Sequence, residues 1–495
     1  MKTLVYNPDG IISPLLLSVL KELTEEDGEL YHFVCNGFFN GCSYNLTGNK
    51  AVCAYCQKKR RLIEKNLQFK SNDYFELEAS SYETSIKDYD YPNFYNFSSL
   101  TNIKIDDIDL GYATLSTVVN DFREYKVEKY NSKQREITKK ILKSAYSYYD
   151  ISNSLLDNIK PDKVIIFNGR LVSTRPLLRL CNVLSIPCYV YEICGTGDKV
   201  NIFKNVLPHD SSAYFKKATE YYNNLESESA IKKANSFYHN KRTGINKTDL
   251  VYTDKQDHKQ FNLRIPKNKK IISFFNSSPD ELIGIGNEYA IGLFPSQAIA
   301  IEETIKNTCQ ANIHFFLRIH PNLEGVNSDD VKELLSLKNK YSNLSVIEPE
   351  SSVSSYLLLD SSDAIVTFGS SIGVEATFHG KTSILLNHAI WDEFDIAYIP
   401  KDKNTFFNMC KDTLTPKPKE NTYPIALYLL EYGEKLKYYS GSYKYGALVN
   451  NKSVEPSFFY KLSYLIYKFH IQLISKNKIQ YRKLKAKISK YFSFL

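Results

Sequence analysis

Short apolar runs alternate with amphipathic segments through the second half of the chain. The runs that we expect to be strands are 271–275, 314–320, 364–368 and 382–386. They are rich in Ile, Val, Leu and Phe, which is typical of strands buried in a parallel sheet. Between the last two runs, Val374 and Phe378 have the spacing of one helix face, and Gly380 ends that segment. This alternation predicts βαβ units and therefore an α/β domain.

Polar residues lie at the ends of three of these strands. They are Ser277 and Ser278 after the first, Arg318, His320 and Asn322 around the end of the second, and Ser370 and Ser371 after the third. Open α/β sheets bind ligands at the carboxyl ends of their strands. A small-residue turn before a helix offers N–H groups and hydroxyls to a phosphate, and Glu375, one helical turn further on, suits ribose hydroxyls. The alternative is an ordinary βαβ turn that binds nothing.

A similar pattern in the first half predicts a second doubly wound sheet. The expected strands are 4–6, 31–34, 163–167 and 186–193. Asn168 and Arg170 follow the third of these strands, and Glu192 lies near the end of the fourth. These side chains either contact an acceptor substrate or take part in a surface or interdomain ion pair. His209, in a loop beside Asp210, is a further candidate for proton transfer, although such a pair in a loop is more often solvated.

Four cysteines lie close together in the sequence: Cys35, Cys42, Cys53 and Cys56. Two residues separate Cys53 from Cys56, as in many zinc and iron–sulfur sites, but the other spacings match no standard zinc pattern. The cluster predicts either a structural zinc ion or iron–sulfur cluster, or four reduced thiols without metal. We expect no cofactor in catalysis, because no acidic metal-binding pair follows the strands named above.

Length and composition are those of a globular protein with two to three domains. The chain has 495 residues, of which 43% are hydrophobic and 24% charged. We expect a first domain at 1–262 with a Cys-containing insertion, a second at 263–400, and a helical region at 401–495. The chain opens without a secretory pattern, and its nine cysteines are an odd number. These features predict a cytoplasmic protein.

The positive charge is concentrated at the end of the chain. The formal net charge is +8, and from Lys461 onward there are nine Lys or Arg and no Asp or Glu. This local excess argues against a general nucleic-acid surface. Apolar residues on one helical stripe of this tail are Leu462, Leu465, Ile466, Phe469 and Leu473. Such a helix either binds an anionic membrane at the inner face of the cell membrane or packs on the core.

The second half of the chain resembles a known family. RIHPN at 318–322, then a strand, then TFGSSIGVEATFHGK at 367–381 resemble the donor-binding half of bacterial capsule and surface-polysaccharide glycosyltransferases of the GT-B type. Similar relatives are the HP-motif sialyltransferases, the Kdo transferases and the CDP-glycerol polymerases of teichoic acid. The resemblance covers about 269–400, with a weaker echo at 167–170 and 191–197.

The resemblance implies two doubly wound Rossmann-like domains facing a central cleft, with C-terminal helices. In these relatives the histidine of the HP motif and the paired serines bind the nucleotide phosphate, and a glutamate binds ribose. The matching residues are His320, Ser370, Ser371 and Glu375. The first half shows no clear counterpart of the acidic base motif of the HP-type sialyltransferases.

The resemblance therefore implies a metal-independent enzyme of capsule or surface-polysaccharide biosynthesis. Its donor would be a cytidine- or uridine-linked sugar, and its acceptor a glycan or lipid-linked glycan. His320 would stabilise charge on the departing phosphate, and Glu192 or His209 would deprotonate the acceptor hydroxyl. The alternatives are a CDP-glycerol-type phosphotransferase and a non-catalytic capsule-assembly or sugar-binding protein.

Overall fold

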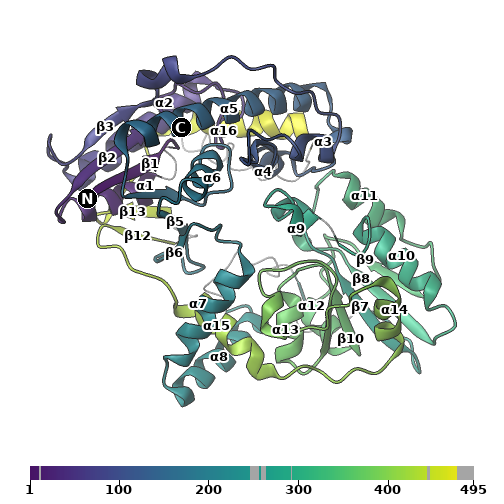
Figure 1. Ribbon diagram of the computed structural model, residues 1–495. Helices are drawn as coiled ribbons and strands as arrows, with labels where there is room; N and C mark the ends of the chain where they lie inside the picture. Colours follow the sequence, from purple (N-terminus) through teal and green to yellow (C-terminus); the bar gives the residue numbers. More distant parts are fainter. Residues whose placement is uncertain (10–12, 246–255, 258–262, 291, 443–445, 477–495) are drawn as a thin grey trace. The chain divides into compact units, whose positions relative to one another are not determined.

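The computed structural model of the chain divides into two compact units (Figure 1). It describes residues 1–495 except 10–12, 246–255, 258–262, 291, 443–445 and 477–495. The first unit is Met1–Pro208 together with the segment from Gly433 onward, and the second is His209–Tyr432.

The first unit contains a six-stranded sheet. Its strands are β1 (Lys2–Asn7), β2 (Glu29–Val34), β3 (Phe75–Glu78), β4 (Lys163–Phe167), β5 (Cys188–Ile193) and β6 (Val200–Lys204). Their order is β3-β2-β1-β4-β5-β6, and every pair is parallel except β5 with β6. The chain runs outward from β1 in one direction and then from β4 in the other. The order therefore reverses between β1 and β4, where doubly wound sheets bind ligands.

Helices complete the first unit. They are α1 (Ser13–Leu23), α2 (Lys50–Leu67), α3 (Phe97–Thr101), α4 (Leu110–Phe122), α5 (Ser132–Ile159), α6 (Arg175–Val183) and, from the end of the chain, α16 (Phe458–Ser475). A small antiparallel sheet is formed by β12 (Tyr439–Ser442), β13 (Gly446–Val449) and β14 (Lys452–Ser453). Val5 and Ile165 of the large sheet pack against Leu16 and Leu20 of α1 in one buried cluster.

The second unit contains a five-stranded sheet in which all pairs are parallel. Its strands are β7 (Lys270–Phe275), β8 (Ile313–Arg318), β9 (Leu344–Ile347), β10 (Ala364–Thr367) and β11 (Thr382–Leu385). Their order is β11-β10-β7-β8-β9, so the reversal lies between β7 and β10. Phe274, Phe315 and Val366 are buried in its core, which explains why these strands are continuous apolar runs in the sequence.

The helices of the second unit precede, separate and follow its strands. They are α7 (Ser211–Asn223), α8 (Ser227–Arg242), α9 (Asn287–Ala290), α10 (Gln297–Asn307), α11 (Asp329–Ser336), α12 (Ser355–Asp360), α13 (Ile372–Phe378), α14 (Lys403–Lys411) and α15 (Tyr423–Glu431). Both α7 and α8 pack on α15.

The predicted fold class is confirmed, since both sheets are doubly wound. The compact units nevertheless differ from the predicted boundaries at 262 and 400. Helices α7 and α8 belong to the second unit because they share a core with α15, and the chain returns to the first unit at Gly433. Among the helices of the described residues, none is both long and apolar enough to cross a membrane.

Candidate functional site

The reversal point of the second sheet brings two polar turns together. Asn276, Ser277 and Ser278 follow β7, and Gly369, Ser370 and Ser371 follow its neighbour β10. Because both strands are parallel, these turns lie at the same edge of the sheet. The geometry is that of a ligand site in an open α/β sheet.

His320, after β8, is held in a defined orientation at this edge. Its backbone N–H donates to Oδ1 of the buried Asn276 at 2.6 Å. Its Nδ1 accepts from the backbone N–H of Asn322 at 3.1 Å. Because Nδ1 is an acceptor, the neutral imidazole carries its proton on Nε2. His320 can therefore donate one hydrogen bond to a ligand oxygen, and Asn322, predicted as a donor ligand, orients it through the backbone.

Ser277 has a hydroxyl with no partner in the described structure. Gln297 fixes its backbone, with Oε1 accepting from the Ser277 N–H at 3.1 Å and Nε2 donating to the Ser277 carbonyl at 3.3 Å. The Oγ of Ser277 is buried and makes no hydrogen bond there. A buried hydroxyl of this kind requires an explanation, and a ligand oxygen at the sheet edge supplies one.

Gly369 keeps the space beside Ser277 open. Its φ of +112° is a conformation that favours glycine, and a β-carbon on it would lie 3.8 Å from the Ser277 Oγ and 3.4 Å from the His388 carbonyl oxygen. The backbone that follows β10 can therefore approach a ligand closely at this point.

The paired serines that follow β10 differ in their surroundings. The N–H of Ser370 donates to Oγ1 of Thr367 at 2.9 Å, whereas Ser371 is exposed and its Oγ donates to Oε1 of Glu375 at 3.3 Å. Glu375 is buried and also binds Nζ of Lys241 at 3.0 Å and the hydroxyl of Tyr356. The predicted ribose ligand thus already has three partners inside the unit.

Two predicted donor ligands have internal structural contacts instead. Arg318 is buried, and its guanidinium donates to the carbonyl oxygens of Glu348 at 2.5 Å and Ser351 at 3.2 Å. Burial lowers the pKa of Arg318 to about 10. Ser278 donates to Oδ1 of Asp280 at 2.9 Å. In the described structure Arg318 thus ties β8 to the segment after β9, and its role as a donor ligand stays a prediction.

His388, which follows β11, is a candidate that the sequence motifs missed. Its Nδ1 pairs with Oδ2 of Asp392, and this hydrogen bond raises the pKa of His388. Its ring meets Tyr289 edge-on at 4.6 Å, and the Tyr289 hydroxyl donates to the carbonyl of His209. His209 thus lies in the second unit near His388, while Asp210 caps α7 by accepting from the Ala213 N–H at 2.8 Å.

The reversal point of the first sheet carries the predicted acceptor-side residues. Nδ2 of Asn168, after β4, donates to Oε2 of Glu192 at 2.5 Å. Burial raises the pKa of Glu192. Nη2 of Arg170 donates to Oδ1 of Asn120 at 3.1 Å. Asn168 and Glu192 therefore lie together in the first unit, whereas His209 belongs to the second.

Asp9, after β1, is the second candidate that the sequence motifs missed. It is buried, and its Oδ2 accepts from the hydroxyl of Ser173, which also bonds Ser43 at 3.0 Å. Its Oδ1 is buried and makes no hydrogen bond in the described structure. Burial raises the pKa of Asp9 to about 6, against the lowering effect of Ser173, Cys42 and Ser43 beside it. A pocket carboxyl with a pKa near neutrality is typical of a general base.

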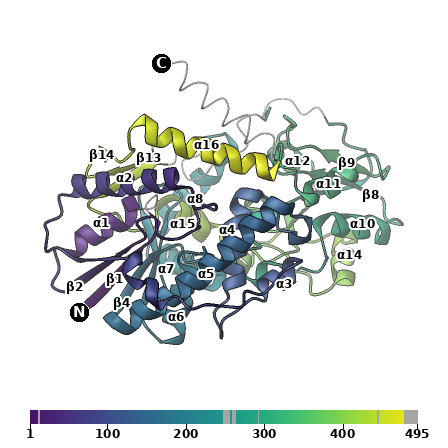
Figure 2. The same cartoon turned by 90° about the horizontal axis from the view of Figure 1, so that it is seen from above.

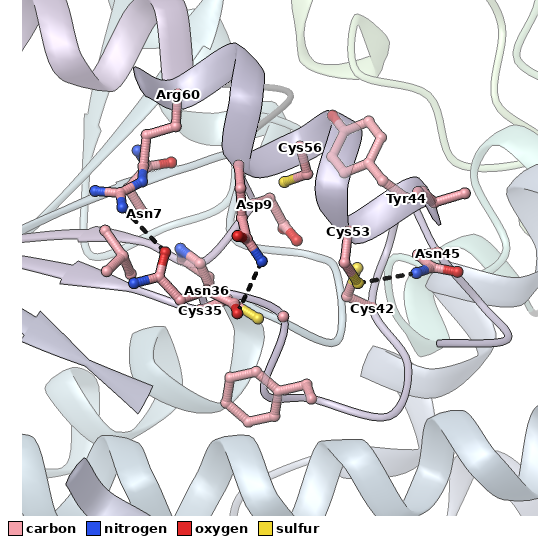
Figure 3. Close-up of a pocket in the computed structure, with 16 residues that line it drawn as sticks. Asn7, Asp9, Cys35, Asn36, Cys42, Tyr44, Asn45, Cys53, Cys56 and Arg60 are labelled. Carbon is pink, nitrogen blue, oxygen red and sulfur yellow. Dashed lines mark hydrogen bonds between the residues drawn. The ribbon is translucent and has the colours of Figure 1, made fainter. Parts of the chain in front are cut away.

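The four clustered cysteines line the same pocket as Asp9 (Figure 3). Cys35 follows β2, and Cys53 and Cys56 lie on α2. Burial raises the pKa of the Cys35 thiol to about 11 and that of Cys42 well above the usual range. No three of these sulfurs lie within 4.8 Å of one another in the described structure. The predicted metal site would therefore need the thiols to move together, and it stays a prediction.

A different side-chain group does bring its ligand atoms together. It consists of His32, Glu64 and Glu76, whose ligand atoms lie within 4.8 Å in the described part of the chain. Arg60 already donates to Glu64 at 2.8 Å and to Glu76 at 2.7 Å. The two carboxylates are therefore already paired with Arg60, whereas Nδ1 of His32 is buried and makes no hydrogen bond in the described structure.

Comparisons with known proteins found matches among solved structures. No model of a protein family and no curated protein matches the chain. Among solved structures, a β-Kdo 2,4-transferase, KpsC of Thermosulfurimonas dismutans, is 10% identical with a TM-score of 0.35, covering 54% of this chain and 79% of its own. The corresponding β-Kdo 2,7-transferase is 13% identical with a TM-score of 0.36, covering 56% and 80%.

A third similar structure is the UDP-GlcNAc 2-epimerase from Neisseria meningitidis, bound to UDP-GlcNAc. It is 12% identical with a TM-score of 0.26, covering 87% of this chain and 99% of its own. At these identities the likeness concerns the fold alone, and the TM-scores are too low to carry an argument. The strand orders of the chain itself carry the assignment of fold.

Proposed function

We propose that the chain is a glycosyltransferase that binds the phosphates of a nucleotide-activated sugar at the β7–β10 edge. The observation that carries this proposal is the buried, unpartnered hydroxyl of Ser277 beside Gly369, at the reversal point of the sheet. A phosphate oxygen would accept from this hydroxyl. The Gly369 backbone allows the close approach that such a contact needs.

The same edge carries the charge stabilisation that the reaction needs. In transfer, the bond between the sugar carbon and the phosphate oxygen breaks, and its electron pair stays with the phosphate. Nε2–H of His320 can donate to that oxygen. His388 adds positive charge, since its contact with Asp392 favours the imidazolium form. These protein groups would thus stabilise the developing charge.

The proposal assigns deprotonation of the acceptor to Asp9 in the first unit. The acceptor hydroxyl oxygen forms the new glycosidic bond, and its proton passes to Oδ1 of Asp9. Asp9 is preferred over Glu192 because Oε2 of Glu192 is held by Asn168 at 2.5 Å, whereas Oδ1 of Asp9 has no partner in the described structure. It is preferred over His209 because Asp9 lies at a sheet reversal point.

A nucleotide screen tests the donor assignment. CMP, CDP, UDP and GDP are added in turn, and the melting temperature of the chain is measured. A ligand at 100 times its dissociation constant stabilises the folded state by about 2.7 kcal/mol. We expect a cytidine or uridine nucleotide to raise the melting temperature, and none of the four doing so would contradict the proposal.

One observation favours a second candidate, a CDP-glycerol-type phosphotransferase. That reaction moves glycerol phosphate and needs a second histidine, and both His388 and His209 lie around Tyr289 in the second unit. The reaction products separate the two candidates, because a glycosyltransferase releases the sugar and a phosphotransferase releases glycerol phosphate. A non-catalytic capsule-assembly protein would release neither.

We place the proposed reaction in the synthesis of a bacterial capsule or surface polysaccharide. The acceptor would be a glycan, free or linked to a lipid, and the enzyme would work at the cytoplasmic face of the membrane. The support for this setting is the resemblance of residues 318–322 and 367–381 to such transferases. Transfer of labelled sugar to lipid-extractable material from a capsulated bacterium would test it.

A further inference from the structure

Helix α16 lies beside other helices of the first unit (Figure 2) and packs on α2, α4 and α5. Tyr467 and Ile471 are buried on one face of α16, and the hydroxyl of Tyr467 accepts from the Leu46 N–H at 2.6 Å. Nζ of Lys468 pairs with Oδ1 of Asp121 at 2.6 Å. These contacts with Leu46, which precedes α2, and with Asp121 of α4 fix the rotation of the helix about its axis.

The other face of α16 exposes a stripe of large apolar side chains. Phe459, Ile466 and Leu473 are 78%, 54% and 51% exposed, and each follows the last by seven residues, close to two helical turns. We call these three residues the apolar stripe. Elsewhere in the described residues, large exposed apolar side chains lie singly or in one adjacent pair on separate elements, so this stripe is unusual for the chain.

The charge of the segment indicates what covers the stripe. From Phe458 to Leu495 the sequence has no Asp or Glu. Two of its lysines form ion pairs within the first unit: Lys461 with Glu455 at 3.2 Å, and Lys468 with Asp121. The sequence has seven further Lys or Arg from Lys476 onward, six of which lie outside the described residues. Apolar side chains followed by cations without anions complement an anionic lipid surface.

We propose that α16 docks on an anionic lipid bilayer, with the apolar stripe at the level of the headgroups. The helix would lie in the plane of the membrane surface. The apolar stripe differs from the predicted one, because Leu465 is less exposed than Ile466. The opposite face of α16 packs on the core. Lipid binding by α16 does not depend on the proposed reaction, because α16 belongs to the first unit and contains no donor-site residue.

A vesicle sedimentation assay with the full chain tests this proposal. Vesicles of phosphatidylcholine alone are compared with vesicles that also contain phosphatidylglycerol. We expect sedimentation only with the anionic vesicles and its loss at about 1 M salt, where the Debye length falls to roughly 3 Å. In the variant Phe459→Gln/Ile466→Gln/Leu473→Gln, we expect the partition coefficient to fall about tenfold or more.

The matched control is Ile231→Gln, which removes one exposed apolar side chain from α8. It should sediment like the wild type, and the triple variant should keep the wild-type melting temperature because its substituted side chains are exposed. Equal sedimentation of wild type and triple variant would overturn the proposal. So would a dimer of the wild type that the triple variant abolishes, since the stripe would then join two copies of the chain.

Discussion

The hydroxyl of Ser277 lies 3.8 Å from the position that a β-carbon on Gly369 would occupy. These residues are far apart in the sequence and meet because β7 and β10 are neighbouring parallel strands. An unpartnered hydroxyl thus faces a backbone position without a side chain. This pair defines the donor site of the proposed enzyme.

Gly369→Ala should weaken donor binding. The added methyl group would crowd the space beside Ser277 and strain a backbone with φ of +112°. The measurement is nucleotide titration by calorimetry, in which we expect the dissociation constant to rise about tenfold or more. Gly380→Ala is the control, because Gly380 also has positive φ (+72°) but has nothing within 4 Å of an added β-carbon. Similar weakening in both variants would point to backbone strain alone.

His320→Ala should lower the turnover number by about a hundredfold or more, because it removes the donor to the departing phosphate. The exposed His239 provides the control variant His239→Ala. The readout is release of nucleotide from the donor, with circular dichroism to check the fold. Turnover of His320→Ala within a few-fold of wild type would remove His320 from the mechanism.

Asp9 should make stability depend on pH. Burial raises its pKa from 3.8 to about 6, so the folded state holds a proton that the unfolded state has lost between these values. Stability then falls as pH rises from about 4 to about 6, by about 3 kcal/mol at 1.36 kcal/mol per pKa unit. Asp9→Asn should lose this decline in urea unfolding. An unchanged pH profile would contradict the assigned environment of Asp9.

Asp9→Asn should also separate binding from transfer. We expect the variant to bind the donor nucleotide like the wild type, because Asp9 belongs to the first unit, while transfer to an acceptor is lost with the base. Donor titration and a transfer assay on the same preparation check this. If the variant transferred sugar as fast as the wild type, Asp9 would not be the general base, and Glu192 or His209 would be the candidates.

The pocket thiols should react slowly with iodoacetamide at neutral pH. The thiolate is the reactive form, and burial raises the pKa of Cys35 to about 11. Mass spectrometry of a labelling time course should show the exposed Cys309 modified before the four pocket thiols. About one zinc ion or one iron–sulfur cluster per chain, lost in Cys53→Ser/Cys56→Ser, would instead establish the metal site.

The second sheet could be predicted because its strands are buried on both faces and stand out as apolar runs. Because these runs show where each strand ends, they also allowed Ser277, His320 and Ser370 to be placed at the strand ends. Asp9 and His388 also follow strands, but neither stands in a motif, and their properties depend on distant partners. The burial of Asp9 involves Ser173, 164 positions away. Nothing local in the sequence indicates that contact.

Other differences have the same origin. Arg318 was expected to bind the donor, yet its partners Glu348 and Ser351 come from the segment after another strand. The unit boundary at Gly433 follows from the packing of α15 against α7 and α8, which local periodicity does not reveal. Local sequence patterns thus indicate where strands end. Contacts between distant segments decide which side chains at those ends can contact a ligand.

Product analysis of donor turnover tests the central claim most directly. The chain is incubated with cytidine- and uridine-linked sugars and with CDP-glycerol, with and without a glycan acceptor, and the products are identified by mass spectrometry. We predict release of nucleotide and of free or transferred sugar, and loss of both products in His320→Ala. Release of glycerol phosphate alone, or no turnover of any donor that binds, would contradict the assignment as a glycosyltransferase.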